Sequence, residues 1–358
     1  MARCSTKASS PEACSAAWGL TVAATIADVA RRAAVSTATV SRVLAGLGHA
    51  TPETQARVLE AARELDYRPS AIARSLKRQS TQTFGLIVTD IENPYFPELV
   101  RVVEDAARAE GYAILLCNAA DDPDREMFYL DLLVERRVDG LIIAASSLGE
   151  RHGEWLAAAP LPVVLINTAA PDVDLPSIAS DNRDGGRQSA DHLLALGHRR
   201  FGYLMPPPRN ADAPERLAGV RDRLEAAGLG DTVVVATGAP LVGGGEAAML
   251  ELLDRAPRTT AVVAYNDLMA IGAMRALRRR GRRVPDDVSV VGFDDVALSA
   301  YVDPPLTTIA QSTAEMARWA VEQLIGAVRD PNGLTMAAVV RLPVRLRARG
   351  SSGPAPAG

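Results

Sequence analysis

From residue 84 onward, short apolar runs alternate with amphipathic helical segments, and this alternation strongly restricts the possible folds. The runs FGLIVTD (84–90) and AILLCN (113–118) flank a segment with helical apolar spacing that ends near Gly111. A strand, a helix and a second strand in this order form a parallel βαβ unit, because the helix carries the chain back across the sheet. Further strands are expected at 139–146, 162–167 and 177–181, with helices at 97–112, 123–138 and near 150–159.

The same alternation starts again near residue 184, so the chain carries two series of βαβ units. The expected helices are 184–197, 214–228, 244–256, 268–280 and 313–328. The expected strands are 201–205, 233–236, 261–267, 288–295, 307–311 and 337–346. Two Rossmann-like parallel-sheet halves, and therefore an α/β fold, follow from this repetition.

The segment before these halves has a different pattern. After Thr25, a residue type that caps helix N-termini, apolar residues recur at helical spacing: Ile26, Val29, Ala30 and Ala33. A turn at Val35 and Ser36 leads into a second expected helix, 37–44. Two such helices make a helix-turn-helix, whose second helix enters the DNA major groove. The window alone is equally compatible with an ordinary helical hairpin that has a solvated polar face.

The residues that follow favour the DNA-binding interpretation. A third helix is expected to begin at Thr51-Pro52-Glu53, which suits N-cap and first-turn preferences. Pro69 then breaks the chain before a short basic segment. Three linked blocks, in order and at matching spacing, resemble the DNA-binding head of the lactose-repressor (LacI/GalR) family: TIADVA (25–30), VSTATVSRVL (35–44) and YRPSAIARSL (67–76).

The resemblance extends to about residue 346 through blocks such as IENPYF, AYNDLMAIGA and VSVVGFDD. It implies an all-α helix-turn-helix DNA-binding head and an α/β two-lobed periplasmic-binding-protein-like core, built from two Rossmann-like parallel-sheet subdomains. The expected boundaries are a head at 24–69, a hinge helix and linker at 70–83, and an effector-binding and dimerisation domain at 84–346.

The resemblance also implies that the chain crosses between the two lobes three times, near Ser180–Asn182, Thr308–Gln311 and Leu342. The N-subdomain then comprises 84–180 and 311–340, and the C-subdomain 181–310 and 341–346. Periodicity cannot show these crossings. The Ser/Ala-rich leader (1–23) and the Gly/Pro/Ser/Ala tail (347–358) are expected to be disordered, with the natural start of the protein nearer Val22.

Charge divides the chain into a basic head and an acidic body. Residues 23–80 hold nine basic and five acidic side chains, whereas the whole chain has a net charge of −4. A basic head suits a phosphate backbone, so double-stranded DNA is its expected partner.

The cysteines indicate a reducing compartment. Cys4, Cys14 and Cys117 form neither a metal-binding spacing nor a disulfide framework, so we expect a cytoplasmic, nucleoid-associated protein without a metal or cofactor. A run of 18 apolar residues is missing, so no membrane partner is expected.

The resemblance assigns the DNA contacts to the second helix and the hinge. Arg42 is expected to bond guanine, Ala38 has only a methyl group for thymine, and Ala34 stands where the family usually has glycine. Leu76 matches a leucine that wedges into the minor groove, which requires a homodimer on a near-palindromic operator. The full expected set is Thr25, Ser36, Thr37, Ala38, Thr39, Ser41, Arg42, Ala73, Leu76 and Lys77.

Polar residues at the ends of the expected strands indicate a ligand site, because ligands bind beyond the carboxyl ends of parallel strands. The same residues commonly cap the next helix, so each alone is weak. These strand-end residues are Asp90, Asn118, Asn167, Asp181, Asn266, Asp267, Asp294 and Asp295. By the resemblance, the effector contacts fall on Tyr95, Phe96, Asp181, Asn210, Asp212, Arg216, Asn266 and Asp294. A sugar or sugar derivative is the first expectation for the effector, and a purine the second.

Other function classes fit the sequence less well. A solute-binding transport protein shares the expected core but should have an export signal and no basic head. A Rossmann-type enzyme should have a G-x-G-x-x-G motif or a nucleophile beside a base, and neither stands out. His198 follows Gly197 at a helix end, which favours a structural role, and Gly243–Gly245 lack the G-K-[ST] of a phosphate loop. The expected function is therefore that of an effector-controlled transcriptional regulator that acts as a repressor, and not that of an enzyme.

Overall fold

The computed structural model describes residues 24–46, 50–67, 80–146, 150–168, 173–208, 212–230, 233–330 and 339–357. These fall into two compact units divided between Thr81 and Gln82. No helix in the described ranges is long and apolar enough to cross a membrane. The expected leader and residues 70–79 of the expected hinge helix and linker lie outside the described residues. The predicted contacts Ala73, Leu76, Lys77 and Asn210 are therefore outside them as well.

The first unit contains three short helices: α2 (Ile26–Ala33), α3 (Thr37–Leu44) and α4 (Pro52–Glu64). Each starts at a hydroxyl cap, as the sequence predicts: Thr25, Ser36 and Thr51 each accept a hydrogen bond from a backbone amide three residues on. The helices enclose a small core of buried aliphatic side chains: Val29, Ala30, Ala33, Val40, Val58, Ala61 and Ala62. The predicted helix-turn-helix is confirmed.

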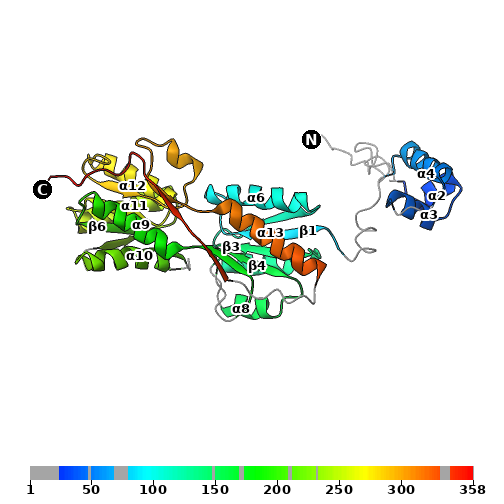
Figure 1. Cartoon of the computed structure of the whole chain (residues 1–358), viewed down its shortest axis with the longest axis horizontal. Helices are drawn as coiled ribbons and strands as arrows, with labels where there is room; N and C mark the ends of the chain where they lie inside the picture. Colours follow the sequence, from blue (N-terminus) through cyan, green and yellow to red (C-terminus); the bar gives the residue numbers. More distant parts are fainter. Residues whose placement is uncertain are drawn as a thin grey trace, which may run out of the picture. The chain divides into compact units, whose positions relative to one another are not determined.

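The second unit consists of two lobes, each a parallel sheet with helices on both faces (Figure 1). In the N-lobe the strand order is β11-β5-β4-β3-β1-β2, with all registered pairs parallel. The strands are β1 (Thr83–Val88), β2 (Ala113–Asn118), β3 (Gly140–Ala144), β4 (Val163–Ile166), β5 (Ser177–Ser180) and β11 (Val339–Leu342).

Both faces of the N-lobe sheet bury apolar residues. One core forms under α6 (Tyr95–Ala109) and α13 (Thr313–Arg329), and includes Phe84, Leu99 and Leu324. The opposite core lies under α7 (Pro123–Glu135) and α8 (Glu150–Ala157). Strands covered on both faces read as continuous apolar runs, which is why β1 and β3 were recognisable in the sequence.

The C-lobe repeats this design with the strand order β7-β6-β8-β9. Helices α9 and α10 cover one face of its sheet, and α11 and α12 the other. The strands are β6 (Phe201–Met205), β7 (Val234–Thr237), β8 (Ala261–Ala264) and β9 (Ser289–Val291). The helices are α9 (Asn182–Ala195), α10 (Asp212–Ala226), α11 (Val242–Arg255) and α12 (Asp267–Arg279).

The chain passes between the lobes three times. It leaves the N-lobe after Ser180, returns after β10 (Thr308–Ala310), and leaves again after Leu342 to form β12 (Arg345–Arg347). Strand β12 pairs antiparallel with β10, so the single closing strand expected at 337–346 is in fact two strands in different sheets. Pro343, which lacks an amide donor, stands between them.

The expected disorder of the tail is wrong for residues 347–357, which pack against the C-lobe. Ser351 is fully buried, its amide donates to the Pro305 carbonyl (2.9 Å), and its own carbonyl accepts from the Val290 amide (2.8 Å). Farther on, the Ala355 amide donates to Leu196 (2.8 Å). Residues 348–357 form neither helix nor strand, and these hydrogen bonds to distant residues fix their conformation.

Candidate functional site

Helix α3 presents the outward face expected of a recognition helix. Thr37, Ala38 and Arg42 are exposed and Ser41 is half-buried, whereas Val40 on the opposite face is completely buried. Within the described residues Arg42 has no ion-pair partner, so its guanidinium is available to a ligand. This face can therefore offer the Thr37 hydroxyl, the Ala38 methyl group and the Arg42 guanidinium to the edges of DNA bases.

The remaining predicted contacts of the head serve as helix caps in the structure. Thr25 and Asp28 form a capping box, and the Thr25 hydroxyl donates to the Asp28 carboxylate (2.7 Å). The Ser36 hydroxyl accepts from the Thr39 amide (3.2 Å) and lies 3.0 Å from the Thr39 hydroxyl. These caps fix the starts of α2 and α3 and leave hydroxyl lone pairs for phosphate contacts.

The turn between α2 and α3 depends on Ala34. This residue has φ 51° and ψ 48°, which is the left-handed conformation. Its amide closes the last turn of α2 on the Arg31 carbonyl (3.3 Å), and the next amide, of Val35, reaches Ala30 (3.0 Å). A Cβ atom is disfavoured in this conformation, so alanine holds the turn at a cost that glycine would avoid.

A cavity of about 240 Å³ lies between the two lobes of the second unit. It is enclosed by residues from the carboxyl ends of strands in both sheets, as expected for parallel sheets. The N-lobe contributes Thr89, Asp90, Asn93, Tyr95, Phe96, Asp121 and Asn167. The C-lobe contributes Asp212, Arg216, Pro240, Tyr265, Asn266 and Asp294, and Gln311 stands on the crossing between them.

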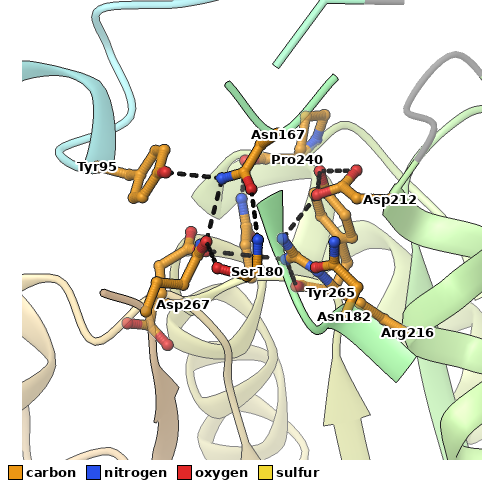
Figure 2. Close-up of polar contacts among 12 residues, drawn as sticks. Tyr95, Asn167, Ser180, Asn182, Asp212, Arg216, Pro240, Tyr265 and Asp267 are labelled. Atoms are coloured by element: carbon orange, nitrogen blue, oxygen red, sulfur yellow. Dashed lines mark hydrogen bonds and ion pairs between the residues drawn. The ribbon is translucent and has the colours of Figure 1, made fainter. Parts of the chain in front are cut away.

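Arg216 is the cationic centre of this cavity and is only 4% exposed. Its guanidinium donates to Asn182 Oδ1 (2.9 Å), the Tyr265 carbonyl (2.6 Å) and Asp212 Oδ2 (2.6 Å), as Figure 2 shows. It also lies over the Phe293 ring, with 3.7 Å between the guanidinium carbon and the ring centroid. Burial opposes its charge, but the combined effects of Asp212, Tyr265 and Asp294 outweigh burial and raise the pKa of Arg216.

Close packing of α9 against α10 places Arg216 deep between them. A Cβ atom on Gly219 would lie 1.9 Å from the Arg183 carbonyl oxygen, and one on Gly186 would lie 2.1 Å from the Arg216 carbonyl oxygen. Only glycine allows this backbone approach. On the outer side of the same helix pair, Arg183 donates two hydrogen bonds to Asp222 (2.8 Å each).

Asp294 faces Arg216 from the loop after β9. Its carboxylate lies 3.7 Å from the Arg216 guanidinium. Strand β9 ends at Val291, earlier than the expected strand 288–295, so Asp294 lies in the loop. Burial is the main cause that raises the pKa of Asp294 to about 8, against the opposing effect of Arg216. A group with this pKa can exchange a proton with an incoming ligand near neutral pH.

A continuous chain of hydrogen bonds joins the lobes at the cavity wall. Asn167 donates to the Tyr95 hydroxyl (2.7 Å) and to Gln311 Oε1 (3.1 Å), which also accepts from the Ser180 hydroxyl (2.7 Å). Gln311 in turn donates to Asp294 Oδ1 (2.7 Å). A change at either end of this chain therefore reaches both lobes.

The structure brings most of the predicted effector contacts together. Tyr95, Phe96, Asp212, Arg216, Asn266 and Asp294 all line the cavity. Asp181 is not among the lining residues. It caps α9 instead, accepting from the Asp184 amide (2.9 Å), which is the alternative role of a polar residue after a strand.

The sequence did not identify several of the residues that line the cavity as effector contacts. Asp90 and Asn167 belonged to the polar strand ends in the sequence, but nothing singled them out from Asn118, which binds the Ile91 amide (3.2 Å). Tyr265 and Gln311 carried no sequence signal, because their place in the site depends on the lobe crossings.

Two residues with ionisable side chains have structural roles. Asp267 is fully buried behind the cavity and accepts hydrogen bonds from the Val296 amide (2.9 Å) and the Ser299 hydroxyl (2.7 Å). His198 is fully buried between Thr260 and Ser289 (3.1 and 3.0 Å), which agrees with the structural role favoured by the sequence. Within the described ranges, His, Cys, Asp and Glu form no cluster that could hold a metal ion.

Each of the two units is similar to a known family of proteins. Residues 25–70 match the bacterial regulatory proteins of the lacI family, and residues 190–352 match a periplasmic binding protein-like domain. The HTH-type transcriptional repressor PurR of Mannheimia succiniciproducens is 38% identical over 303 residues, which covers 84% of this chain and 91% of that protein.

Solved structures show the same similarity. The lac repressor dimer bound to operator and the anti-inducer ONPF is 28% identical, covers 92% of this chain and 99% of its own, and has a TM-score of 0.83. A LacI family regulator from Enterococcus faecium with bound ribose is 31% identical, with a TM-score of 0.69, and covers 76% of this chain and 99% of its own.

Proposed function

The chain belongs to the lacI family of bacterial regulatory proteins, and we propose that it represses transcription from a near-palindromic operator under the control of a sugar-like effector. The observation that carries this proposal is the hydrogen-bond chain from Tyr95 to Asp294, which lines a cavity and joins the two lobes. A ligand that binds there contacts both lobes at once, and so can change the angle between them.

The exposed face of α3 supports the DNA-binding half of the proposal. We infer that Arg42 reads guanine through two parallel hydrogen bonds, while Thr37 and Ala38 contact neighbouring bases. The hydroxyls of Thr25, Ser36, Thr39 and Ser41 are assigned to phosphates. A near-palindromic site needs two heads, so we propose a homodimer, in keeping with the dimeric lac repressor bound to its operator.

A sugar suits the chemistry of the cavity. Eight of its 18 lining residues carry a carboxylate or an amide. Carboxylates accept from hydroxyl groups, and amides both accept from them and donate to them. Tyr95 and Phe96 meet edge to face at 5.3 Å and supply an apolar surface for a ring. The volume lies below the roughly 300–1,000 Å³ of drug-sized ligand sites, which favours a single-ring compound, and ribose occupies the related E. faecium regulator. A purine is the second candidate, because Phe96 and Tyr95 can also stack on a base.

The proposal is tested by DNA binding in the presence of candidate effectors. Sugars and nucleosides are screened for a change in operator affinity, and the active compound is retested on Arg216→Ala. We expect this variant to keep DNA binding but lose the response to the effector. Arg223→Ala is the matched control, since Arg223 lies on the same helix and pairs with Asp191 at the surface (2.6 Å). An undiminished response in Arg216→Ala would exclude the cavity as the effector site.

We also infer that the chain is not an enzyme. The ionisable residues of the cavity hold one another in place: Asp212 accepts from Arg216 and from the Tyr265 hydroxyl (2.9 Å), and Asp294 accepts from Gln311. This arrangement suits recognition, whereas nucleophilic catalysis needs a nucleophile bonded to a base. The effector is incubated in large molar excess over the protein and analysed by chromatography. Conversion of many effector molecules per protein molecule would contradict this inference.

A further inference from the structure

The loop after β9 contains two consecutive aspartates that face different surroundings. Asp294 lines the cavity and lies opposite Arg216. Asp295 is absent from the described lining residues, and its Oδ1 accepts a hydrogen bond from Arg349 Nη2 (2.6 Å). We infer that Arg349 is a positioning residue of the effector site, because it holds Asp295 and thereby directs Asp294 into the cavity. The inference rests on the proposed function, since it takes this cavity as the effector site.

The backbone of the two aspartates has a conformation that residues with a side chain rarely adopt. Its φ angle is 115° at Asp294 and 56° at Asp295. Two consecutive residues stay in this region only if their surroundings determine the conformation. Three successive amides of the loop are hydrogen-bonded: Asp294 to the Ile309 carbonyl (2.9 Å), Asp295 to Thr308 Oγ1 (3.4 Å) and Val296 to Asp267 Oδ2 (2.9 Å). The middle bond is the longest, so the Asp295 amide alone holds the centre of the loop weakly and its side chain has to contribute.

Arg349 is held in place by contacts that do not involve Asp295. Its backbone amide donates to Thr307 Oγ1 (2.8 Å), and its Nη1 donates to the Leu306 carbonyl (2.9 Å). Two residues farther along, the fully buried Ser351 fixes the same segment by accepting from the Thr307 amide (2.8 Å). Because the guanidinium is planar and rigid, these bonds also fix the direction of Nη2, which donates to Asp295.

The ion pair of Arg349 with Asp295 is short and partly buried. The two side chains are 24% and 22% exposed, and the bond is charge-assisted. Arg347 is the other arginine near Asp295 among the described residues, but it is 59% exposed and lies 4.0 Å away. Water and salt screen a partly buried pair less than an exposed one. Arg349 therefore holds Asp295 more firmly than Arg347 does.

The position of Asp294 depends on its neighbour because the two residues share a peptide bond. Asp294 makes its cavity contacts through one oxygen: Oδ1 accepts from Gln311 Nε2 (2.7 Å) and lies 3.7 Å from Arg216 Nη1. Hydrogen bonds weaken steeply with distance and angle, so a small rotation of the loop backbone disrupts these contacts. The C-terminal segment 348–357, red in Figure 1, is therefore part of the effector site through Arg349, although it does not line the cavity.

Hydrogen exchange measured by mass spectrometry tests the positioning of Asp294 without any effector. Arg349→Ala should accelerate exchange of the hydrogen-bonded amides at 294–296 by about tenfold, while the amides of α10 keep their rates. Asp295→Asn removes the charge of the same pair and leaves the other two bonds of Arg349, and asparagine tolerates positive φ as aspartate does. This variant should accelerate the same amides by about threefold.

Arg345→Ala, at an exposed position of β12, is the matched control and should leave exchange at 294–296 unchanged. Acceleration confined to this loop in either Arg349→Ala or Asp295→Asn supports the inference. It is overturned if neither variant accelerates exchange at 294–296 beyond that of the rest of the C-lobe, because Arg349 then contributes only to general stability.

Operator binding then tests the role of Arg349 in the response, with ribose, glucose and adenosine as the probes. Arg349→Ala should keep the operator affinity measured without a probe, but should require about tenfold more of the active probe for a half-maximal response. Arg349→Lys, which retains the charge, should restore part of the response, and Arg345→Ala should respond normally.

The two measurements separate this inference from the proposed function. A normal response of Arg349→Ala to a probe that acts on the wild type would overturn the role of Arg349 in the effector site. If none of the three probes acts on the wild type, the failure lies in the sugar or nucleoside assignment of the proposed function. Exchange at 294–296 still decides in that case whether Arg349 positions Asp294.

Discussion

Gln311 donates from its side-chain amide to Asp294 Oδ1 at 2.7 Å, although the two residues serve different parts of the core. Asp294 lies in the C-lobe, facing Arg216, whereas the oxygen of the same Gln311 amide accepts from Asn167 and Ser180 of the N-lobe. One side chain therefore satisfies polar groups of both lobes. Gln311 stands at the crossing that follows β10, where a change in the angle between the lobes must be absorbed.

Replacement of Gln311 should weaken the core measurably. Gln311→Ala removes three hydrogen bonds and leaves partners in a part-buried site, which costs about 1–3 kcal/mol of the free energy of unfolding. Urea denaturation followed by circular dichroism measures the loss. Gln323→Ala, on α13, is the control and should change stability by less than about 0.5 kcal/mol. Equal effects of the two substitutions would show that the bridge contributes nothing particular.

Asp294 should make the stability of the core depend on pH on the alkaline side. Burial raises the folded-state pKa of Asp294 to about 8, above its value near 4 in an unfolded chain. The folded state therefore holds the proton more tightly. This contribution is fully present below the unfolded pKa, and it is lost as pH rises through the folded pKa. Between pH 7 and pH 9 it amounts to about 1 kcal/mol.

Asp294→Asn isolates this contribution. Glu126 also has a pKa raised by burial, and the wild type and the variant share its alkaline loss. The nearby Asp267 carboxylate raises the pKa of Asp294, so the variant removes the contribution of this interaction together with that of Asp294 itself. The free energy of unfolding, measured at pH 7, 8 and 9, should fall less steeply in Asp294→Asn. Parallel pH profiles would mean that Asp294 is already ionised at pH 7.

Ser351 tests the order of the tail. Its hydroxyl accepts from the Thr307 amide (2.8 Å) and donates to the Val290 carbonyl (2.6 Å), and the side chain is fully buried. Ser351→Ala leaves both backbone groups unpaired and should cost about 1–3 kcal/mol of the free energy of unfolding. Pro354→Ala, at an exposed position of the same segment, is the control. A tail without fixed structure would tolerate both changes equally.

Local sequence patterns predict individual helices and strands well. They do not predict which residues of different helices and strands come into contact. Thr25, Ser36 and Thr51 cap the helices that their types predict, and apolar runs such as 84–88 become buried strands. Asp181 shows the limit of such rules, because capping and ligand binding require the same residue types. Asn167 and Gln311 are 144 positions apart, and only the lobe crossings bring them into contact.

Ala34 should limit the stability of the head. It occupies the left-handed region at φ 51°, where an alanine is disfavoured by about 1 kcal/mol relative to glycine. Ala34→Gly should therefore slow amide exchange of the buried residues Val29 and Val40 by about fivefold, corresponding to about 1 kcal/mol. Ala45→Gly, at a right-handed position after α3, is the control and should accelerate exchange. Faster exchange in Ala34→Gly would mean that the added chain entropy of glycine outweighs the relief.

Arg42 should determine which operator the head prefers. It is exposed on the outward face of α3, and a bidentate bond to guanine contributes about 1–3 kcal/mol of discrimination. Selection from a randomised near-palindromic library should return a guanine at one position of each half-site for the wild type. Arg42→Ala should lose that preference, with affinity for its best site reduced by roughly tenfold to a hundredfold.

The control separates base reading from attraction to phosphate. Arg63 is also exposed in the head, on α4, where it lies 3.9 Å from Glu60. Arg63→Ala should leave the selected sequence unchanged, and any loss of affinity should be the same for matched and mismatched sites. Because Ala38 offers only a methyl group beside Arg42, the neighbouring base should be selected weakly in every variant, with thymine favoured. An Arg42→Ala library that still returned the wild-type guanine would assign base reading to other residues of the head.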